Sequence, residues 1–200
     1  SSAASDVYKR QDYSKVVVKK PWGYEYLIFV NESIAVWILY VKCGAQTSMH
    51  CHPAKKTSLV VLEGKVNCST ITNSLDRSAG EGLLIDKGVF HQTAAISEPG
   101  AFVMEIETPV NKRDLARLMD KYGRKGKGYE REDHHSFNTQ NYNYISFQNV
   151  EIQHNLKKRF GQCSLTFQKL TKEKVLDEIL ELLKPDDVIC ILKGLSLIHI

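Results

Sequence analysis

The chain has 200 residues, of which 42% are hydrophobic and 25% are charged, fractions typical of an ordinary folded protein. Its formal net charge of +4 is too small to indicate a nucleic-acid-binding surface, and no apolar run approaches the ~20 residues of a membrane span. The five cysteines show no CxxC spacing, which is typical of reduced packing residues in a cytoplasmic protein. We therefore expect a cytoplasmic protein with neither nucleic-acid nor membrane partners.

The two ends of the chain are interpreted as foreign to the protein's own sequence. Residues 1–11 back-translate to a common transposon-type sequencing adapter. Residues 195–200 can be encoded by the reverse complement of the codons for residues 6–11. We interpret both ends as adapter scars and exclude them from reasoning about the fold. The remaining insert, residues 12–194, is expected to be a fragment of a longer protein.

Short extended segments dominate the first half of the insert. They are rich in β-branched and aromatic residues and are bounded by Gly, Asn or Pro. The predicted strands are 16–18, 24–30, 34–41, 59–62, 65–71, 82–85, 91–96 and 102–107. Many closely spaced short strands are typical of an antiparallel sandwich or jelly roll. The prediction for residues 12–124 is therefore an all-β domain.

The sequence changes character after these strands. Residues 114–121 match a short helix, and residues 125–143 are polar and glycine-bearing, as in a linker. His134 and His135 lie in this linker, where we expect them to be solvated, with a secondary metal site as the alternative.

A second unit is predicted over residues 144–194. Its expected elements are extended segments at 144–152 and 163–170, a helix from Thr171 to Pro185, and a strand at 188–194. The last strand resembles residues 59–64, so this unit is interpreted as a truncated, partial α+β unit that could begin a second repeat of the first domain.

Two closely spaced histidines are the strongest chemical signal in the chain. In an extended strand side chains alternate, so His50 and His52 project from one face, while Cys51 points away from it. A third imidazole from a neighbouring strand would complete a divalent-metal site of the kind that zinc, iron, nickel and manganese accept. His91 is the candidate for this third ligand. The alternative is two histidines that lie close by chance on a polar strand face.

Glycines frame these histidines at the spacing of a known superfamily. The matching residues are Gly44, His50, His52 and Gly64 in a first motif and Gly80, Gly88 and His91 in a second. The chain therefore resembles the cupin superfamily, of the RmlC-like jelly-roll type. The resemblance implies a double-stranded β-helix barrel over residues 12–124 that holds a divalent metal ion through His50, His52 and His91.

The chain departs from the cupin motifs at three positions. Thr57 stands where the first motif has its glutamate, the fourth metal ligand, and Asp86 and Ala95 replace the proline and asparagine of the second motif. A threonine hydroxyl is a poor substitute for a carboxylate toward a divalent ion. Three imidazoles can still hold a metal and leave positions open, as in catalytic zinc sites.

Segments on either side of the predicted barrel indicate which group of cupins the chain resembles most. Residues 20–25 read Lys-Pro-Trp-Gly-Tyr-Glu, and residues 105–109 read Glu-x-Glu-Thr-Pro. Residues 114–124 read Asp-x-x-Arg-x-x-Asp-x-Tyr-Gly-Arg. Over residues 20–130 the chain is similar to cupin-type mannose-6-phosphate isomerases. This resemblance implies a sugar-phosphate aldose–ketose isomerase of carbohydrate metabolism that forms a homodimer, as cupins commonly do.

An isomerase of this kind needs a base and a phosphate-binding set. Glu105 and Glu107 share a strand face and are the candidate proton-transferring carboxylates, although both could instead lie on a solvated outer face. The candidate phosphate-binding cations are Lys55, Lys56, Arg117 and Arg124. Two alternatives remain open: a noncatalytic sugar-binding or regulatory cupin module of a larger enzyme, and a three-histidine iron dioxygenase.

Overall fold

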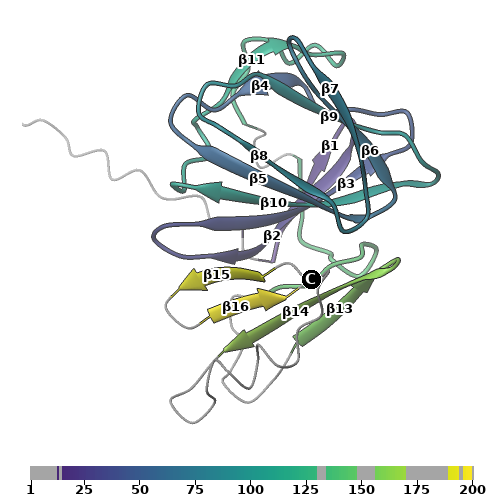
Figure 1. Ribbon diagram of the computed structural model, residues 1–200, viewed down its shortest axis with the longest axis vertical. Helices are drawn as coiled ribbons and strands as arrows, with labels where there is room; N and C mark the ends of the chain where they lie inside the picture. Colours follow the sequence, from purple (N-terminus) through teal and green to yellow (C-terminus); the bar gives the residue numbers. More distant parts are fainter. Residues whose placement is uncertain are drawn as a thin grey trace, which may run out of the picture.

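The computed structural model describes residues 13, 15–129, 134–147, 156–169, 189–193 and 196–199 (Figure 1). Within these residues the structure is built of β-strands and turns and contains no α-helix. No helix in the described part of the chain is long and apolar enough to cross a membrane.

The first domain consists of two facing β-sheets. The seven-stranded sheet has the order β12-β1-β2-β3-β10-β5-β8, and the five-stranded sheet has the order β11-β4-β9-β6-β7. The strands of the larger sheet are β1 (Val17–Lys20), β2 (Gly23–Val30), β3 (Ala35–Lys42), β5 (Lys56–Glu63), β8 (Gly82–Ile85), β10 (Gly100–Thr108) and β12 (His135–Ser136). Those of the smaller sheet are β4 (Met49–Cys51), β6 (Lys65–Thr70), β7 (Ser74–Ser78), β9 (His91–Ala95) and β11 (Ala116–Met119).

The chain winds between these sheets from β3 to β11. Successive strands alternate between the two sheets, apart from the β6–β7 hairpin, and all pairings between named strands are antiparallel. Gly64 lies between β5 and β6, where its positive φ of 80° provides a backbone conformation that glycine adopts readily. This winding is a double-stranded β-helix, which confirms the predicted all-β class, although the sheets do not close into a complete barrel.

Both faces of the seven-stranded sheet are buried, because alternate side chains of its strands enter different cores. Trp37 and Leu39 of β3 point into the core between the two sheets, whereas Val36 and Ile38 belong to a second core on the outer face. A third, four-stranded sheet contributes Phe160 and Leu165 to this outer core. Its strands, in the order β13-β14-β16-β15, are β13 (Leu156–Phe160), β14 (Cys163–Lys169), β16 (Ser196–His199) and β15 (Ile189–Lys193).

Burial on both faces explains why several of these strands read as nearly continuous apolar runs. The predicted homodimer stays a prediction.

Several predicted elements differ from the observed ones. The helix expected at 114–121 is wrong, because residues 116–119 form β11 and pair with β4. The described part of the segment 144–152, residues 144–147, forms no strand, and the helix after Thr171 lies outside the described residues. β16 falls within the range interpreted as an adapter scar, and that interpretation stays a prediction.

Candidate metal centre

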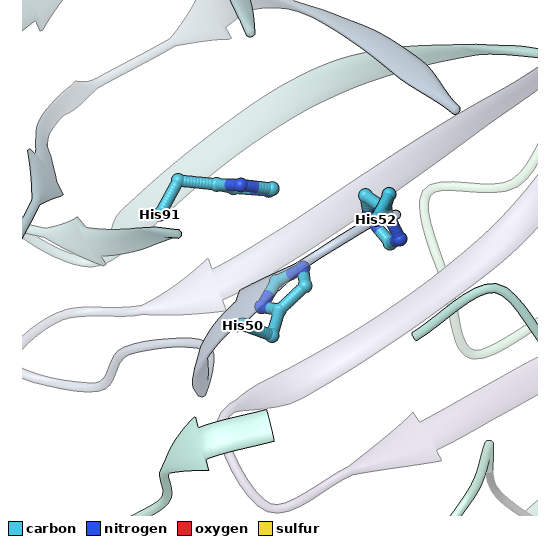
Figure 2. Close-up of side chains that lie close together, drawn as sticks. All are labelled: His50, His52 and His91. Carbon is cyan, nitrogen blue, oxygen red and sulfur yellow. The ribbon is translucent and has the colours of Figure 1, made fainter. Parts of the chain in front are cut away.

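The structure brings the three predicted histidines together (Figure 2). His50 lies on β4, His52 directly follows that strand, and His91 begins β9, the neighbouring strand in the five-stranded sheet. His50 and His91 are opposite each other in the antiparallel register. The ring centres are 4.4 Å apart for His50 and His91, 5.0 Å for His50 and His52, and 5.5 Å for His52 and His91. One ligand atom from each ring lies within 4.8 Å of the other two.

Backbone carbonyl groups determine which ring nitrogen is available in each histidine. The Nδ1 atom is 2.8 Å from the Ser48 oxygen in His50, 2.5 Å from the Asp114 oxygen in His52, and 3.0 Å from the Val89 oxygen in His91. A carbonyl oxygen only accepts hydrogen bonds, so each Nδ1 carries the hydrogen. In a neutral imidazole the lone pair then lies on Nε2, the atom that would bind a metal ion.

Burial keeps these imidazoles neutral. It lowers the pKa of His50 well below the usual 6.5, with the nearby His91 and His52 acting in the same direction. It lowers the pKa of His52 to about 4, reinforced by the charge of Lys55, and it also lowers that of His91. Neutral imidazoles are the metal-binding form, so binding at pH 7 would not have to displace ring protons.

The orphaned atom of this group is His52 Nε2. It is buried and has no hydrogen-bond partner in the described part of the chain. Leaving a buried polar atom without a partner costs roughly 1–3 kcal/mol, a cost that a bound ion would remove. The donor set and this orphaned atom therefore both fit a divalent metal ion.

Asp114, which lies 62 residues after His52 in the sequence, supports the candidate metal centre. Its backbone oxygen accepts the His52 Nδ1 hydrogen, and its carboxylate accepts hydrogen bonds of 2.9 Å from the backbone amides of Ala54 and Lys55. The segment after β10 therefore fixes the turn that follows β4. Sequence reasoning placed Asp114 in the closing motif but did not foresee this role.

His50 and His52 border a cavity of about 60 Å³, whereas His91 is not among the residues that line it. Five of the candidate catalytic and phosphate-binding residues line it, namely Glu105, Glu107, Lys55, Arg117 and Arg124, and their roles stay predictions. The full lining also includes Lys20, Trp22, Glu25, Leu39, Thr47, Ser48, His50, His52, Lys112, Leu115 and Tyr129.

Lys56 does not line this cavity, which corrects its expected place beside Lys55. Adjacent residues of an extended chain point in opposite directions. Lys55 is buried, whereas the Lys56 side chain is half exposed and forms an ion pair of 2.9 Å with Asp86 on the outer face. Lys56 therefore adds no charge to the cavity lining.

Lysine–glutamate ion pairs connect several of the residues that line the cavity. Lys55 Nζ lies 2.8 Å from Glu107 Oε1, and Lys112 Nζ lies 3.4 Å from the same oxygen. Lys112 also lies 3.6 Å from Glu25 Oε1, and Lys20 lies 3.4 Å from that atom. The hydroxyl of Tyr129 donates to Glu25 as well.

These contacts separate the three buried glutamates by pKa. Burial alone would raise the pKa of all three glutamates. Lys20 and Lys112 outweigh it at Glu25 and lower the pKa to about 2, while Lys112 and Lys55 lower that of Glu107. For Glu105, burial and the neighbouring charge of Glu107 raise the pKa to about 7. Glu105 is therefore the carboxylate best matched to gaining and losing a proton near neutral pH.

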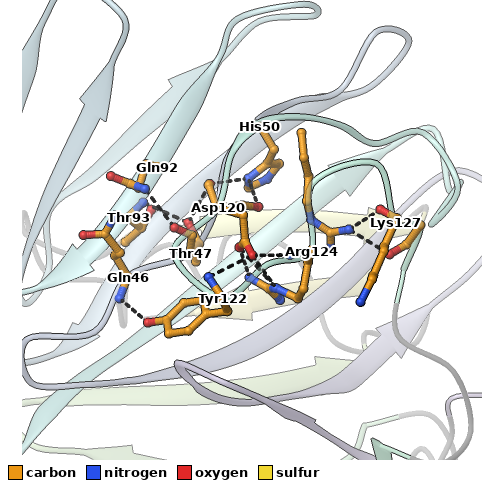
Figure 3. Close-up of polar contacts among 12 residues, drawn as sticks. Gln46, Thr47, His50, Gln92, Thr93, Asp120, Tyr122, Arg124 and Lys127 are labelled. Atoms are coloured by element: carbon orange, nitrogen blue, oxygen red, sulfur yellow. Dashed lines mark hydrogen bonds and ion pairs between the residues drawn. The ribbon is translucent and has the colours of Figure 1, made fainter.

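Two arginines approach the cavity from the closing segment. The guanidinium group of Arg124 forms an ion pair of 2.7 Å with the buried carboxylate of Asp120 (Figure 3). Arg117 donates to the backbone oxygens of Lys127 and Gly128. Both side chains are thus held by the segment of residues 120–128, which positions their charges at the cavity.

Besides that of Asp114, sequence reasoning missed the site roles of Lys20, Glu25, Trp37, Lys112 and Tyr129. Lys112 lies 3.7 Å above the centre of the Trp37 ring, and Lys20 lies 3.9 Å above that of Tyr129. Lys20 and Glu25 belong to the segment that resembles the isomerases, and this resemblance was a signal that could have found them. Lys112 and Tyr129 lie in segments with no motif that distinguishes them from surface residues.

No protein-family profile matches the sequence, and no curated protein matches it. KdgF from a Halomonas species is a similar solved structure, with a TM-score of 0.43 and 15% identity over 46% of this chain and 83% of that one. An RmlC-like cupin from Shewanella frigidimarina gives a TM-score of 0.44 and 15% identity, over 48% and 85% of the two chains. The oxalate decarboxylase of Lactobacillus farciminis, in complex with formate, gives 0.46 and 16%, over 51% and 33%. The structural neighbours are thus cupins and RmlC-like double-stranded β-helix proteins, and the closer resemblance to mannose-6-phosphate isomerases stays a prediction.

Proposed function

We propose that this protein binds one divalent metal ion through the Nε2 atoms of His50, His52 and His91. The observation that carries the proposal is the shared arrangement of the three rings, each with Nδ1 directed at a backbone carbonyl. These three backbone contacts leave each neutral imidazole with one nitrogen that can bind a metal ion. One ligand atom of each ring lies within 4.8 Å of those of the other two. A chance cluster of histidines has no reason to share this arrangement.

The charges around the cavity favour an anionic substrate. Lys20, Lys55 and Lys112 balance three glutamates, and Arg124 is paired with Asp120. A divalent cation would add positive charge to this wall. A phosphate or carboxylate group on the substrate would compensate it, since Arg and Lys bind such groups through charge-assisted hydrogen bonds.

The chemistry that fits these groups is aldose–ketose isomerisation of a sugar phosphate of the mannose-6-phosphate type. When bound, a divalent metal ion would polarise the carbonyl and hydroxyl oxygens of adjacent carbons and make the C–H proton of the hydroxyl-bearing carbon acidic. Glu105, whose pKa of about 7 lies near neutrality, accepts that proton and returns it to the former carbonyl carbon, while the hydroxyl proton passes to the former carbonyl oxygen. Arg117, Arg124 and Lys55 hold the anionic group.

Two assays test this proposal. Protein purified without chelator is expected to contain about one divalent ion per chain, and the His50→Ala/His52→Ala double variant is expected to contain none. Metal retained by the double variant would refute the site. The metal-loaded protein is then incubated with mannose 6-phosphate and monitored for fructose 6-phosphate. Absence of product together with saturable binding of the sugar phosphate would favour a noncatalytic sugar-binding module.

A further inference from the structure

Glu107 lies directly opposite Thr57 on the neighbouring strand. The two residues are register partners in the antiparallel pairing of β10 with β5, and each is about 1% exposed. Opposed residues of such a pair have their side chains on the same face, with Cβ atoms about 4.5–5.5 Å apart. A carboxylate is therefore available beside the position at which the resembled motif carries one, although residue 57 itself has none.

The Glu107 carboxylate lies close to His52, one of the three histidines. One ligand atom each from His52, Glu105 and Glu107 lie within 4.8 Å of one another. His52 thus belongs both to this cluster and to the group of three imidazoles, and it links the two groups.

Glu107 and His52 each carry a buried atom that has no partner within the described residues. Glu107 Oε1 is bonded to Lys55, but Glu107 Oε2 is buried and has no hydrogen-bond partner within the described residues. The same holds for His52 Nε2. Two buried acceptor atoms with no donor are costly unless a cation lies between them. Lys55 and Lys112 fix the carboxylate through its other oxygen and leave Oε2 to the site.

We propose that Glu107 supplies from β10 the anionic metal ligand that residue 57 of β5 lacks. This inference rests on the proposed metal-binding function and adds a fourth protein ligand to it. The other register partner of Glu107 is Ala35, so small side chains flank it on both neighbouring strands and leave it room. A glutamate at residue 57 would instead place two carboxylates face to face.

The test moves the carboxylate between the two strands. Zinc affinity is measured at pH 7 by competition with a chromophoric chelator for the unmodified protein and for Glu107→Gln, which keeps the side-chain shape. We expect the variant to bind zinc at least about tenfold more weakly. Adding Thr57→Glu to Glu107→Gln restores a carboxylate across the strand pair and is expected to recover most of the lost affinity. Glu32→Gln, at an exposed glutamate in the turn between β2 and β3, is the control and is expected to retain the affinity of the unmodified protein.

Three outcomes would overturn the inference: unchanged affinity in Glu107→Gln, no recovery in the double variant, or an equal loss in Glu32→Gln. If zinc binding also survives in His50→Ala/His52→Ala, the proposed metal site itself fails. If only the histidine variant loses zinc, the site holds and the role of Glu107 fails.

A crystal structure of the zinc-loaded, unmodified protein needs no variant to fold. A Glu107 oxygen at about 2.0–2.2 Å from the ion supports the inference, since this is the usual zinc–carboxylate distance. A carboxylate that remains bound only to Lys55 and Lys112 overturns it.

Discussion

Replacing Glu25 by Gln tests the buried charge network through its pH dependence. The Glu25 side chain is buried, and its Oε1 atom lies 3.4 Å from Lys20 Nζ and 3.6 Å from Lys112 Nζ. These cations overcome the effect of burial and lower the pKa of Glu25 from 4.5 to about 2. Between these pH values the unfolded chain binds a proton that the folded chain does not, so stability falls as the pH falls.

The size of the effect follows from that interval. The change from 4.5 to about 2 corresponds to about 3 kcal/mol of stability, which is fully present above pH 4.5 and is lost as the pH falls toward 2. At pH 3.5 the unfolded chain already favours the protonated residue about tenfold, so roughly 1 kcal/mol has been lost. Glu25→Gln has no carboxyl group at this position to titrate, so the variant lacks this part of the pH dependence.

Urea denaturation at pH 7 and pH 3.5 measures the difference. The gap in free energy of unfolding between the unmodified protein and Glu25→Gln is expected to shrink by roughly 1 kcal/mol at the lower pH. Glu32→Gln, at an exposed glutamate in the turn between β2 and β3, is the control and should leave the gap constant. A gap for Glu25→Gln that is equal at both pH values would refute the reasoning, because the carboxylate would then titrate alike in both states.

Two further predictions concern the fold. Phe160→Ala should reduce the free energy of unfolding by about 3–5 kcal/mol, because Phe160 is fully buried and its ring centre lies 5.1 Å from that of Phe102 across the outer core. A loss below about 1 kcal/mol in urea denaturation would contradict the packing of the third sheet on the barrel. Gly23→Ala should reduce the free energy of unfolding by more than about 3 kcal/mol, because an added Cβ would lie 1.9 Å from the Tyr40 backbone oxygen. Gly80 has open space around it, so the control Gly80→Ala should lose only the ~1–2 kcal/mol that a left-handed backbone costs a residue with a Cβ. Equal losses in thermal or urea unfolding would contradict this close approach.

Much of the first domain was predictable from the sequence because its strands are marked by alternation and by turn residues. The helix predicted at 114–121 failed for a physical reason. The spacing of Leu115 and Leu118 fits one side of a helix, but residues 116–119 pair with β4 opposite His50 and Cys51. Leu115 lines the cavity and Leu118 is partly exposed, so long-range pairing decides the conformation of this short segment.

The candidate site was predictable only in part. Strand alternation brought His50 and His52 to one face, and the motif spacing added His91. Alternation also implies that Lys55 and Lys56 point in opposite directions, but the sequence alone does not say which of them enters the cavity. Lys112 could not have been found, because only the three-dimensional fold places it between Glu25 and Glu107.

Isothermal titration of zinc into metal-free protein at pH 7 is the most direct test of the metal centre. We predict saturable binding of one ion per chain, and no such binding in the His50→Ala/His52→Ala variant. Failure of the unmodified protein to bind zinc, or equal binding by the variant, would contradict the assignment of the three imidazoles as ligands.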